Sequence, residues 1–368
     1  MIHRSLAAAA TTMLCPRVFA QSGDTQPPNA DAVVEQYMKE YSVPGMALAY
    51  ARGPRLLYAS CFGEANTSDH AAVQRNSLFR IASNSKAFTS AAIFLLIEQG
   101  KLGLDDKIFA PGGILGQFSN LGPHRNWIHS ITVHDLLTHT SGGWSNDGND
   151  PMFERPALNQ QQLIAWTLQT HPLQNPPGEK FAYSNFGYCV LGRVIEHASG
   201  QPYARFVRQH VMRPAGIHDM RIGTNKTAPL EVHYYGQGGE NPYDIPVARM
   251  DSHGGWISTA IDMTQFLAAL FSPEDMEGGP SILTQQSLHQ MTQGTHANPG
   301  YACGLAVNSA GNAWHAGSLP GTMSLMVHTR SGLAWSAVLN TRSPIKSAQI
   351  DLDKMLWKIA RSVPQWRA

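Results

Sequence analysis

The chain has 368 residues, 43% of them hydrophobic, and a formal net charge of +1. This length and apolar content suffice for a full hydrophobic core, in one large domain or two intertwined ones. Charged residues make up 14% of the chain and form no basic or acidic block, so we expect no nucleic-acid partner. The longest apolar run, 91–97, is far too short to span a membrane.

The segment 1–20 is predicted to be an export signal. Arg4 supplies a positive start, 6–14 a short apolar stretch, and 18–20 a small-residue cleavage site. The segment 21–30 is polar and contains prolines, as in a linker. Export would place the protein in the periplasm or outside the cell. The alternative interpretation of this N-terminus is a disordered tail.

The predicted elements begin with an amphipathic helix at 30–41. Two strands follow at 46–51 and 55–62, joined by a Gly- and Pro-containing segment that favours a hairpin turn. The strongest helix prediction is 79–100. Its middle is apolar on every side, so we expect it at the centre of the protein, and Gly100 is a natural C-terminal stop.

The middle of the chain is predicted to be mainly helical, and the C-terminal part returns to strands. The helices expected there are 160–170, 184–199 and 261–271, the last capped by Ser258 or Thr259. The C-terminal elements expected are strands at 323–329 and 333–340 and a closing amphipathic helix at 350–359.

This order of elements predicts an antiparallel sheet assembled from both chain ends, with a mostly helical region inserted between them. The predicted domain covers 31–361. Its sheet region is about 31–80 and 295–361, and its helical region is about 81–294.

The first chemical motif is Ser83-Asn84-Ser85-Lys86, near the start of the buried helix. Residues at i and i+3 share a helix face, so the Lys86 amine can reach the Ser83 hydroxyl. A serine needs a base to become a nucleophile, and a desolvated lysine near a helix N-terminus can have a pKa low enough to act as one. The same helix N-terminus offers backbone N–H groups to an oxyanion.

This motif is weak by itself, because a Ser-x-x-Lys arises about once by chance in a chain of this size. Ser343-Pro344-Ile345-Lys346 fits it too, but no partner segment follows that copy. The alternative interpretation makes Ser83 a helix cap and Lys86 a solvated side chain.

A second motif is Tyr183-Ser184-Asn185. Tyr183 could share a proton with Lys86, and Asn185 could hold both Lys86 and a substrate carbonyl. The alternative is a tyrosine packed on the core and an asparagine that caps the next helix.

The third motif is His315-Ala316-Gly317-Ser318, at a predicted strand end. Gly317 would let a substrate approach the backbone closely. The Ser318 N–H could then be an oxyanion donor beside that of Ser83. A single histidine at a strand end is otherwise more often structural.

These motifs, in this order, resemble those of the serine β-lactamase and penicillin-binding superfamily, which carry Ser-x-x-Lys, Tyr-x-Asn and Lys/His-x-Gly. The resemblance runs from about 31 to 361 and is greatest to the class C-like branch, with its D-alanyl-D-alanine carboxypeptidases, D-aminopeptidases and family VIII carboxylesterases. Further segments that look similar are 136–142, 214–217 and 254–258. The resemblance implies an α/β (α+β) fold of the β-lactamase/transpeptidase type, with the active site in the cleft between sheet and helical regions.

The resemblance also implies the roles of individual residues. Ser83 would be the nucleophile, and Lys86 and Tyr183 would handle protons, either of them as the base. The residues expected to bind substrate or line the oxyanion side are Asn185, His315, Gly317 and Ser318. His315 stands where class C β-lactamases usually have a lysine. A histidine is mostly neutral near pH 7, which suits the esterases and peptidases of the family better than the β-lactamases.

Other chemistries find little support. The chain has no Gly-x-Ser-x-Gly elbow, no dinucleotide-binding glycine pattern and no His-Glu-x-x-His, and its cysteines show no pairing or metal-site spacing. We therefore expect no metal and no cofactor. His134 and His139 are interpreted as structural residues. Three aromatic residues are assigned to the pocket wall or, equally, to core packing: Trp144, Tyr188 and Trp256.

The predicted reaction is acyl transfer to water through acyl-Ser83, on a small-molecule ester or a D-amino-acid-containing amide or peptide. A class C-like β-lactamase, with a β-lactam substrate, is the first alternative. The second is a penicillin- or peptide-binding or sensing domain with little turnover. The loop 224–251 is expected to shape the pocket, and the sequence gives no signal for an oligomeric state.

Overall fold

The computed structural model describes residues 27–123, 125–148, 150–272 and 281–366. The predicted export signal at 1–20 and most of the predicted linker at 21–30 therefore lie outside the described residues.

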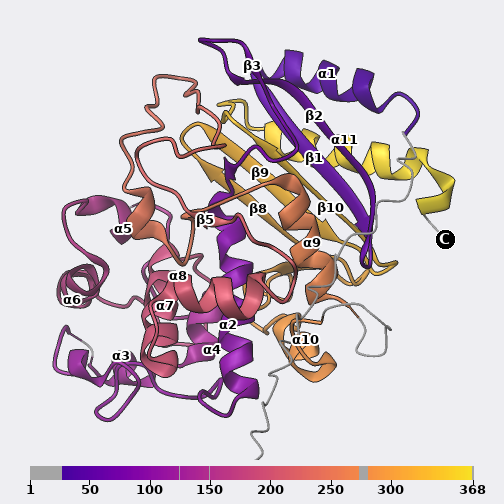
Figure 1. The fold of residues 1–368 in the computed structure, drawn as a ribbon. Helices are drawn as coiled ribbons and strands as arrows, with labels where there is room; N and C mark the ends of the chain where they lie inside the picture. Colours follow the sequence, from indigo (N-terminus) through magenta and orange to yellow (C-terminus); the bar gives the residue numbers. More distant parts are fainter. Residues whose placement is uncertain (1–26, 124, 149, 273–280, 367–368) are drawn as a thin grey trace, which may run out of the picture.

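A seven-stranded antiparallel sheet forms one side of the protein (Figure 1), with the strand order β3-β2-β1-β10-β9-β8-β7. Its strands are β1 (Gly45–Arg52), β2 (Arg55–Asn66), β3 (Ala71–Ala72), β7 (Ala306–Val307), β8 (Ala313–Leu319), β9 (Thr322–His328) and β10 (Leu333–Leu339). Strand β1 pairs with β10, so the two chain ends meet in the middle of the sheet. This arrangement confirms the predicted fold class.

Strand β1 is buried on both faces because helices cover both sides of the sheet. Successive side chains of a strand point to opposite faces. Met46, Leu48 and Tyr50 join a core cluster with helices α1 (Ala30–Glu40) and α11 (Ala348–Ser362). Ala47 and Ala49 face the other cluster, where α9 (Ala260–Leu270) packs against β1 and β10.

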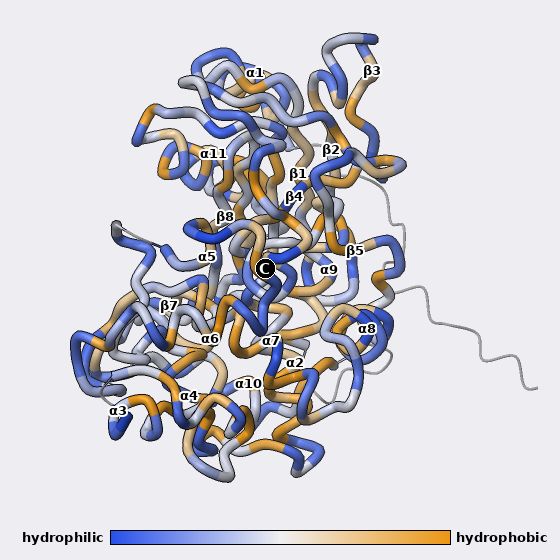
Figure 2. Tube along the Cα trace, turned by 90° about the vertical axis from the view of Figure 1, so that its left-hand side faces the viewer, coloured by the Kyte–Doolittle hydropathy of each residue, from blue (hydrophilic) through white to orange (hydrophobic). Residues whose placement is uncertain are grey.

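The helical region lies beside the sheet, and a view from the side shows the same division (Figure 2). Its buried helix α2 (Ser85–Glu98) packs against α7 (Asn185–Ser199). The other helices are α3 (Arg125–Ser130), α4 (Val133–Leu137), α5 (Pro151–Glu154), α6 (Gln160–Thr170), α8 (Tyr203–Val207) and α10 (Gln285–Met291). A small sheet of the order β4-β6-β5 joins Phe79–Arg80, Trp256–Ser258 and Arg221–Ile222.

The prediction of a helix from 79 was wrong at its N-terminal end. Phe79–Arg80 forms strand β4, which pairs with β6. Ala82 then has a φ of 46°, and a short 3₁₀ turn (Ala82–Asn84) leads into α2 at Ser85. A residue with a positive φ does not fit within a right-handed helix, so Ala82 separates strand β4 from helix α2. Ser83 therefore lies in the turn between them.

The other main elements lie where the sequence predicts them. Helix α6 has the predicted bounds, and α7 and α9 begin and end within one residue of theirs. Thr259 caps α9 by accepting from the Asp262 backbone N–H. One detail was wrong: His315 lies within strand β8 and not at its end, because β8 continues to Leu319.

Candidate active site

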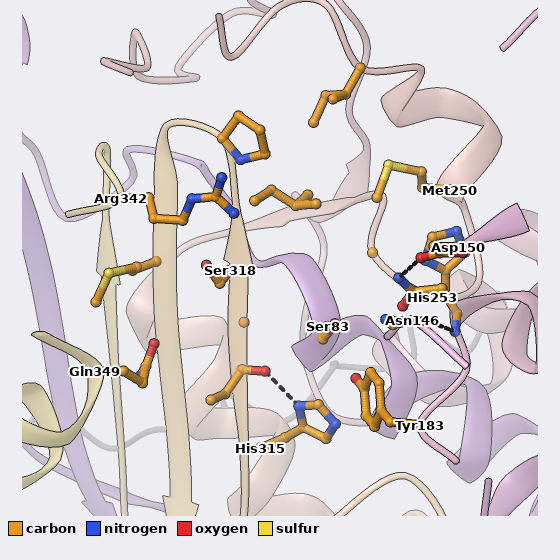
Figure 3. A pocket seen from close by; sticks show the side chains of 18 of the residues that line it. Ser83, Asn146, Asp150, Tyr183, Met250, His253, His315, Ser318, Arg342 and Gln349 are labelled. Carbon is orange, nitrogen blue, oxygen red and sulfur yellow. Dashed lines mark hydrogen bonds between the residues drawn. The ribbon is translucent and has the colours of Figure 1, made fainter. Parts of the chain in front are cut away.

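The predicted site residues converge on one cavity of about 1020 Å³, between strand β8 and the helical region. The lining includes Ser83, Tyr183, Asn185, His315, Gly317 and Ser318. Figure 3 shows Ser83 between Ser318 on one side and Tyr183 on the other. The three motifs are therefore brought to a single place.

Lys86 lies directly beneath Ser83, in the first turn of α2 and fully buried. Its Nζ donates to Ser83 Oγ at 2.9 Å, to Asn185 Oδ1 at 2.7 Å and to the His253 carbonyl oxygen at 3.0 Å. An ammonium has three N–H donors, so these partners account for all of them. The lysine is thus held in one orientation, aimed at the serine.

The electrostatics of this site favour a lysine that can lose its proton. Desolvation lowers the pKa of Lys86 to about 7, although the nearby Asp150 carboxylate opposes this by favouring the charged form. Asp150 accepts from Asn185 Nδ2 at 2.7 Å and from the Met152 backbone N–H at 2.9 Å. Near neutral pH, a substantial fraction of Lys86 is therefore a neutral amine that can accept a proton.

Tyr183 supplies a neutral phenol next to the same serine. Burial raises its pKa, while a hydrogen bond with Ser83 has a smaller, lowering effect. Lys86 Nζ lies 4.8 Å from the centre of the Tyr183 ring. The hydroxyl of Tyr183 thus stays protonated at neutral pH and can donate.

A hydrogen-bonded chain that includes two residues of the cavity wall, Tyr301 and His315, fixes the tautomers of two histidines. The Ser184 backbone N–H donates to His139 Nδ1 at 3.1 Å, so His139 carries its proton on Nε2. His139 Nε2 lies 3.2 Å from the Tyr301 hydroxyl, and that hydroxyl lies 3.1 Å from His315 Nε2. His315 Nδ1 donates to the Ala316 carbonyl oxygen at 2.7 Å.

The donor and acceptor of each hydrogen bond follow from the two outer nitrogens, because His139 Nδ1 accepts and His315 Nδ1 donates. His139 donates to the Tyr301 oxygen, and Tyr301 donates to His315 Nε2, which must be an acceptor because Nδ1 holds the ring proton. Burial lowers the pKa of His315 to about 3 and that of His139 well below its usual value. Both imidazoles are neutral, and both nitrogens of His315 already have protein partners.

Gly317 has a packing role that the sequence did not predict. A Cβ at this position would lie 2.3 Å from the Ile81 carbonyl oxygen and 2.3 Å from Ser324 Oγ. The glycine lets β8 pack closely against the segment that precedes Ser83. This contact sets the distance between Ser83 and the Ser318 end of the strand.

Several residues of the site lie outside the three motifs from which the site was predicted. Asn146 accepts from the Asn185 backbone N–H at 2.8 Å, and Asp150, His253 and Tyr301 also line the cavity. His139 lies in the segment 136–142, which resembles the family, and the sequence analysis interprets it as a structural residue. The others stand outside every motif, because only long-range packing brings them to Ser83.

Three aromatic residues are core residues, which agrees with one of the two interpretations of the sequence. The indole N–H of Trp144 donates to the His171 carbonyl oxygen, and that of Trp256 donates to the Tyr203 hydroxyl. Tyr188 donates to the Leu137 carbonyl oxygen. All of them are at most 5% exposed.

The second Ser-x-x-Lys copy lies in the wall of the same cavity, a placement the sequence did not predict. Ser343 and Lys346 both line it, in the segment between β10 and α11. They precede the helix, so their side chains do not share a helix face. Lys346 is exposed and lacks the desolvation that makes Lys86 a candidate base.

The described residues offer neither a metal site nor a membrane-spanning helix. Within these residues, no group of three or more His, Cys, Asp or Glu side chains is placed to hold a metal ion. Among the same residues, no helix is both long and apolar enough to cross a membrane.

Solved structures that share this fold include an amidase and a penicillin-binding protein homologue. A D-amino acid amidase from Ochrobactrum anthropi superposes with a TM-score of 0.74 at 24% identity, covering 92% of this chain and 99% of the amidase. An octameric penicillin-binding protein homologue from Pyrococcus abyssi gives 0.72 at 23% identity, covering 91% of this chain and 79% of the homologue.

The sequence comparisons identify the family. Residues 30–356 match the Beta-lactamase family, and the chain belongs to it. A D-alanyl-D-alanine-carboxypeptidase/endopeptidase of Escherichia coli, AmpH, is 30% identical over 70% of this chain and 66% of AmpH. A penicillin-binding protein of Bacillus subtilis is 34% identical over 54% of this chain and 42% of its own length. The chain thus matches only about two fifths to two thirds of the length of these relatives.

Proposed function

We propose that this protein is a serine hydrolase that acts through an acyl-Ser83 intermediate on esters or on D-amino-acid-containing amides and peptides. One observation carries the proposal. A buried lysine amine, whose pKa burial lowers to about 7, donates to the Ser83 hydroxyl at 2.9 Å. A serine and a base at hydrogen-bonding distance, with the base oriented by further groups, form the arrangement that nucleophilic catalysis requires.

In the proposed acylation step, neutral Lys86 takes the Ser83 proton as the serine oxygen attacks the substrate carbonyl carbon. The backbone N–H groups of Ser83 and Ser318 stabilise the resulting oxyanion. Tyr183 donates its proton to the leaving group as the bond to that group breaks, and the Lys86 ammonium returns a proton to Tyr183. The pKa directions favour Lys86 over Tyr183 as the base, because burial favours the neutral form of both groups.

In the deacylation step, a water attacks the acyl carbonyl and gives its proton to the same lysine–tyrosine pair. The Ser83 oxygen leaves and regains a proton from that pair. The net reaction consumes one water and restores every protein group, so it needs no metal and no cofactor.

The neutral state of His315 favours esters and D-amino acid derivatives over β-lactams. With its pKa lowered to about 3 and both ring nitrogens bonded, His315 is not a cation for a β-lactam carboxylate. The names of the relatives, a D-alanyl-D-alanine carboxypeptidase and a D-amino acid amidase, suit the same substrate class. A class C-like β-lactamase is the alternative, and fast turnover of nitrocefin would favour it.

Intact mass spectrometry tests the nucleophile. The protein is incubated separately with p-nitrophenyl acetate, a penicillin and a D-Ala-D-Ala peptide, and any adduct is mapped by peptide digestion. We expect an adduct on Ser83 that is lost in Ser83→Ala. Ser343→Ala is the matched control, because it removes the serine of the second motif from the same cavity. An adduct on Ser343, or full hydrolysis by Ser83→Ala, would overturn the proposal.

The export signal proposed for 1–20 has its own test. Expression of the full chain in a bacterial host should give a mature protein that begins at or near Gln21 in the periplasm or medium. Full-length protein confined to the cytosol would contradict it.

A further inference from the structure

Strand β8 has one face that is only partly covered. Successive side chains of a strand point to opposite faces of the sheet, and along β8 buried residues alternate with three that keep some exposure: Trp314, Ala316 and Ser318. On the same face, the residues of β9 that pair with Trp314 and Ala316 are Val327 and Leu325, and both are buried in the core cluster of α11. The cover that α11 gives to β9 is therefore incomplete over β8.

A groove of about 320 Å³ lies between this face and α11. Its apolar lining comprises Trp314, Ala316, Leu325, Val327, Ile350 and Trp357, and Asp353 with three amide side chains completes it. Ile350 is 59% exposed, although it is a large hydrophobic residue. Apolar surface that is exposed in a groove and bordered by polar residues is typical of a ligand-binding site.

This groove continues the active-site cavity. Three residues line both of them: Trp314, Ala316 and Gln349. Figure 3 shows Gln349 on one side of strand β8, with Ser83 and His315 on the other side. Strand β7 pairs with β8 at 313–314, so from His315 onward this edge of β8 has no strand beside it in the described part of the chain. A molecule bound at Ser83 can therefore extend across the edge of β8 into the groove.

The leaving group is the part of the substrate that lies nearest to this groove. Tyr183, the proposed proton donor to the leaving group, lies beside His315, and their ring centres are 6.2 Å apart. His315 stands between Trp314 and Ala316 in β8, and these two residues line the groove. The leaving group therefore departs on the groove side of Ser83.

We propose that this groove binds an apolar part of the leaving group and that Ile350 is a specificity-determining residue within it. The substrate class is then an ester or amide whose alcohol or amine carries an alkyl chain or an aromatic ring. Burial of that apolar surface against Trp314, Ile350 and Trp357 stabilises the bound substrate. This inference rests on the proposed acyl-Ser83 chemistry.

The test compares phenyl acetate with 4-butylphenyl acetate, whose phenols have similar acidity and therefore leave at similar intrinsic rates. The ratio of their kcat/KM values reports acylation, the step in which the leaving group takes part. Wild-type protein should favour the butyl ester about tenfold, less than full burial of the chain would give, because the groove is open to solvent. Ile350→Asp places a charge in the groove wall and should bring the ratio close to one, and Ile350→Leu should keep it.

Phenyl hexanoate carries the same extension on its acyl part and should show no gain over phenyl acetate that Ile350→Asp removes. Such a gain would overturn the assignment of the groove to the leaving group. Leu230→Asp is the matched control, because Leu230 is 54% exposed and lines neither the cavity nor the groove. It should keep the wild-type ratio.

Acetylation of Ser83 by p-nitrophenyl acetate, measured by intact mass in every variant, separates this inference from the proposed function. Without any acetylation of the wild-type protein, the acyl-Ser83 chemistry fails. Acetylation with a wild-type ratio near one, or with a ratio that Ile350→Asp leaves unchanged, overturns only the role of the groove.

Discussion

Replacement of Asp150 by asparagine tests whether Lys86 is the base that activates Ser83. The Asp150 carboxylate bonds to Asn185 Nδ2 and Asn185 Oδ1 bonds to Lys86 Nζ, each at 2.7 Å. A single amide group therefore separates the two charges. Desolvation lowers the pKa of Lys86 to about 7, and this carboxylate works in the opposite direction. Asp150→Asn removes the negative charge while keeping the size of the side chain.

The expected shift can be worked from this geometry. Two unit charges about 7 Å apart, at an effective dielectric constant of about 20, attract by about 2 kcal/mol. That free energy corresponds to between one and two pKa units, at about 1.4 kcal/mol per unit. Loss of the anion destabilises the ammonium, so the pKa of Lys86 falls. Because the neutral amine is the base, the acylation rate rises with pH through this pKa, and its midpoint should move to lower pH by about one unit or more.

The assay is single-turnover acetylation of Ser83 by p-nitrophenyl acetate, quenched and measured by intact mass between about pH 5 and 9. Mass does not depend on the ionisation of the released phenol. Asp147→Asn is the charge-matched control, because Asp147 is an exposed acid of the same loop and bonds to Ser145. Its midpoint should match that of wild type. A midpoint that stays in place or rises in Asp150→Asn would refute the assignment of Lys86 as the base.

Three further predictions concern single substitutions. Lys86→Met should slow acylation by about 10²- to 10⁴-fold, the usual contribution of a general base, while substrate binding measured on the unreacted complex changes little. Gly317→Ala should lower stability by about 1–3 kcal/mol in thermal denaturation, because the new Cβ meets Ile81 and Ser324 at 2.3 Å; an unchanged midpoint would contradict the close packing. Tyr301→Phe should cost about 1–3 kcal/mol, since it leaves two buried histidine nitrogens without their partner; chemical denaturation measures this loss, and full stability would contradict the hydrogen-bonded chain.

Local signals in the sequence determined most of the elements. Helix α6 begins with a capping box between Asn159 and Gln162, and α9 begins at a Thr259 cap, so side chains next to each helix set its start. The apolar run at 46–51 and the Gly- and Pro-containing turn after it predicted strand β1, and the order of the motifs predicted the family. These features depend on residues close together in the chain, which a single sequence displays directly.

Long-range contacts decided the rest of the fold and the site. Phe79–Arg80 became a strand because β6, far along the chain, pairs with it. In the sequence, the apolar pattern of 79–100 fits one continuous helix, because it carries no sign of the distant strand that pairs with its first residues. Tyr301 stands outside every motif, yet its hydroxyl joins His139 to His315 by hydrogen bonds.

The sequence by itself determined which residue types are available for chemistry at Ser83, through three short motifs and their order. The tertiary structure decided their charges and partners: burial sets the pKa of Lys86, and packing of the segment after β10 brings Lys346 to the cavity. Desolvation and charge pairing depend on what surrounds a group in space. Neighbours in space come from distant parts of the chain, and their positions exist only once the chain has folded.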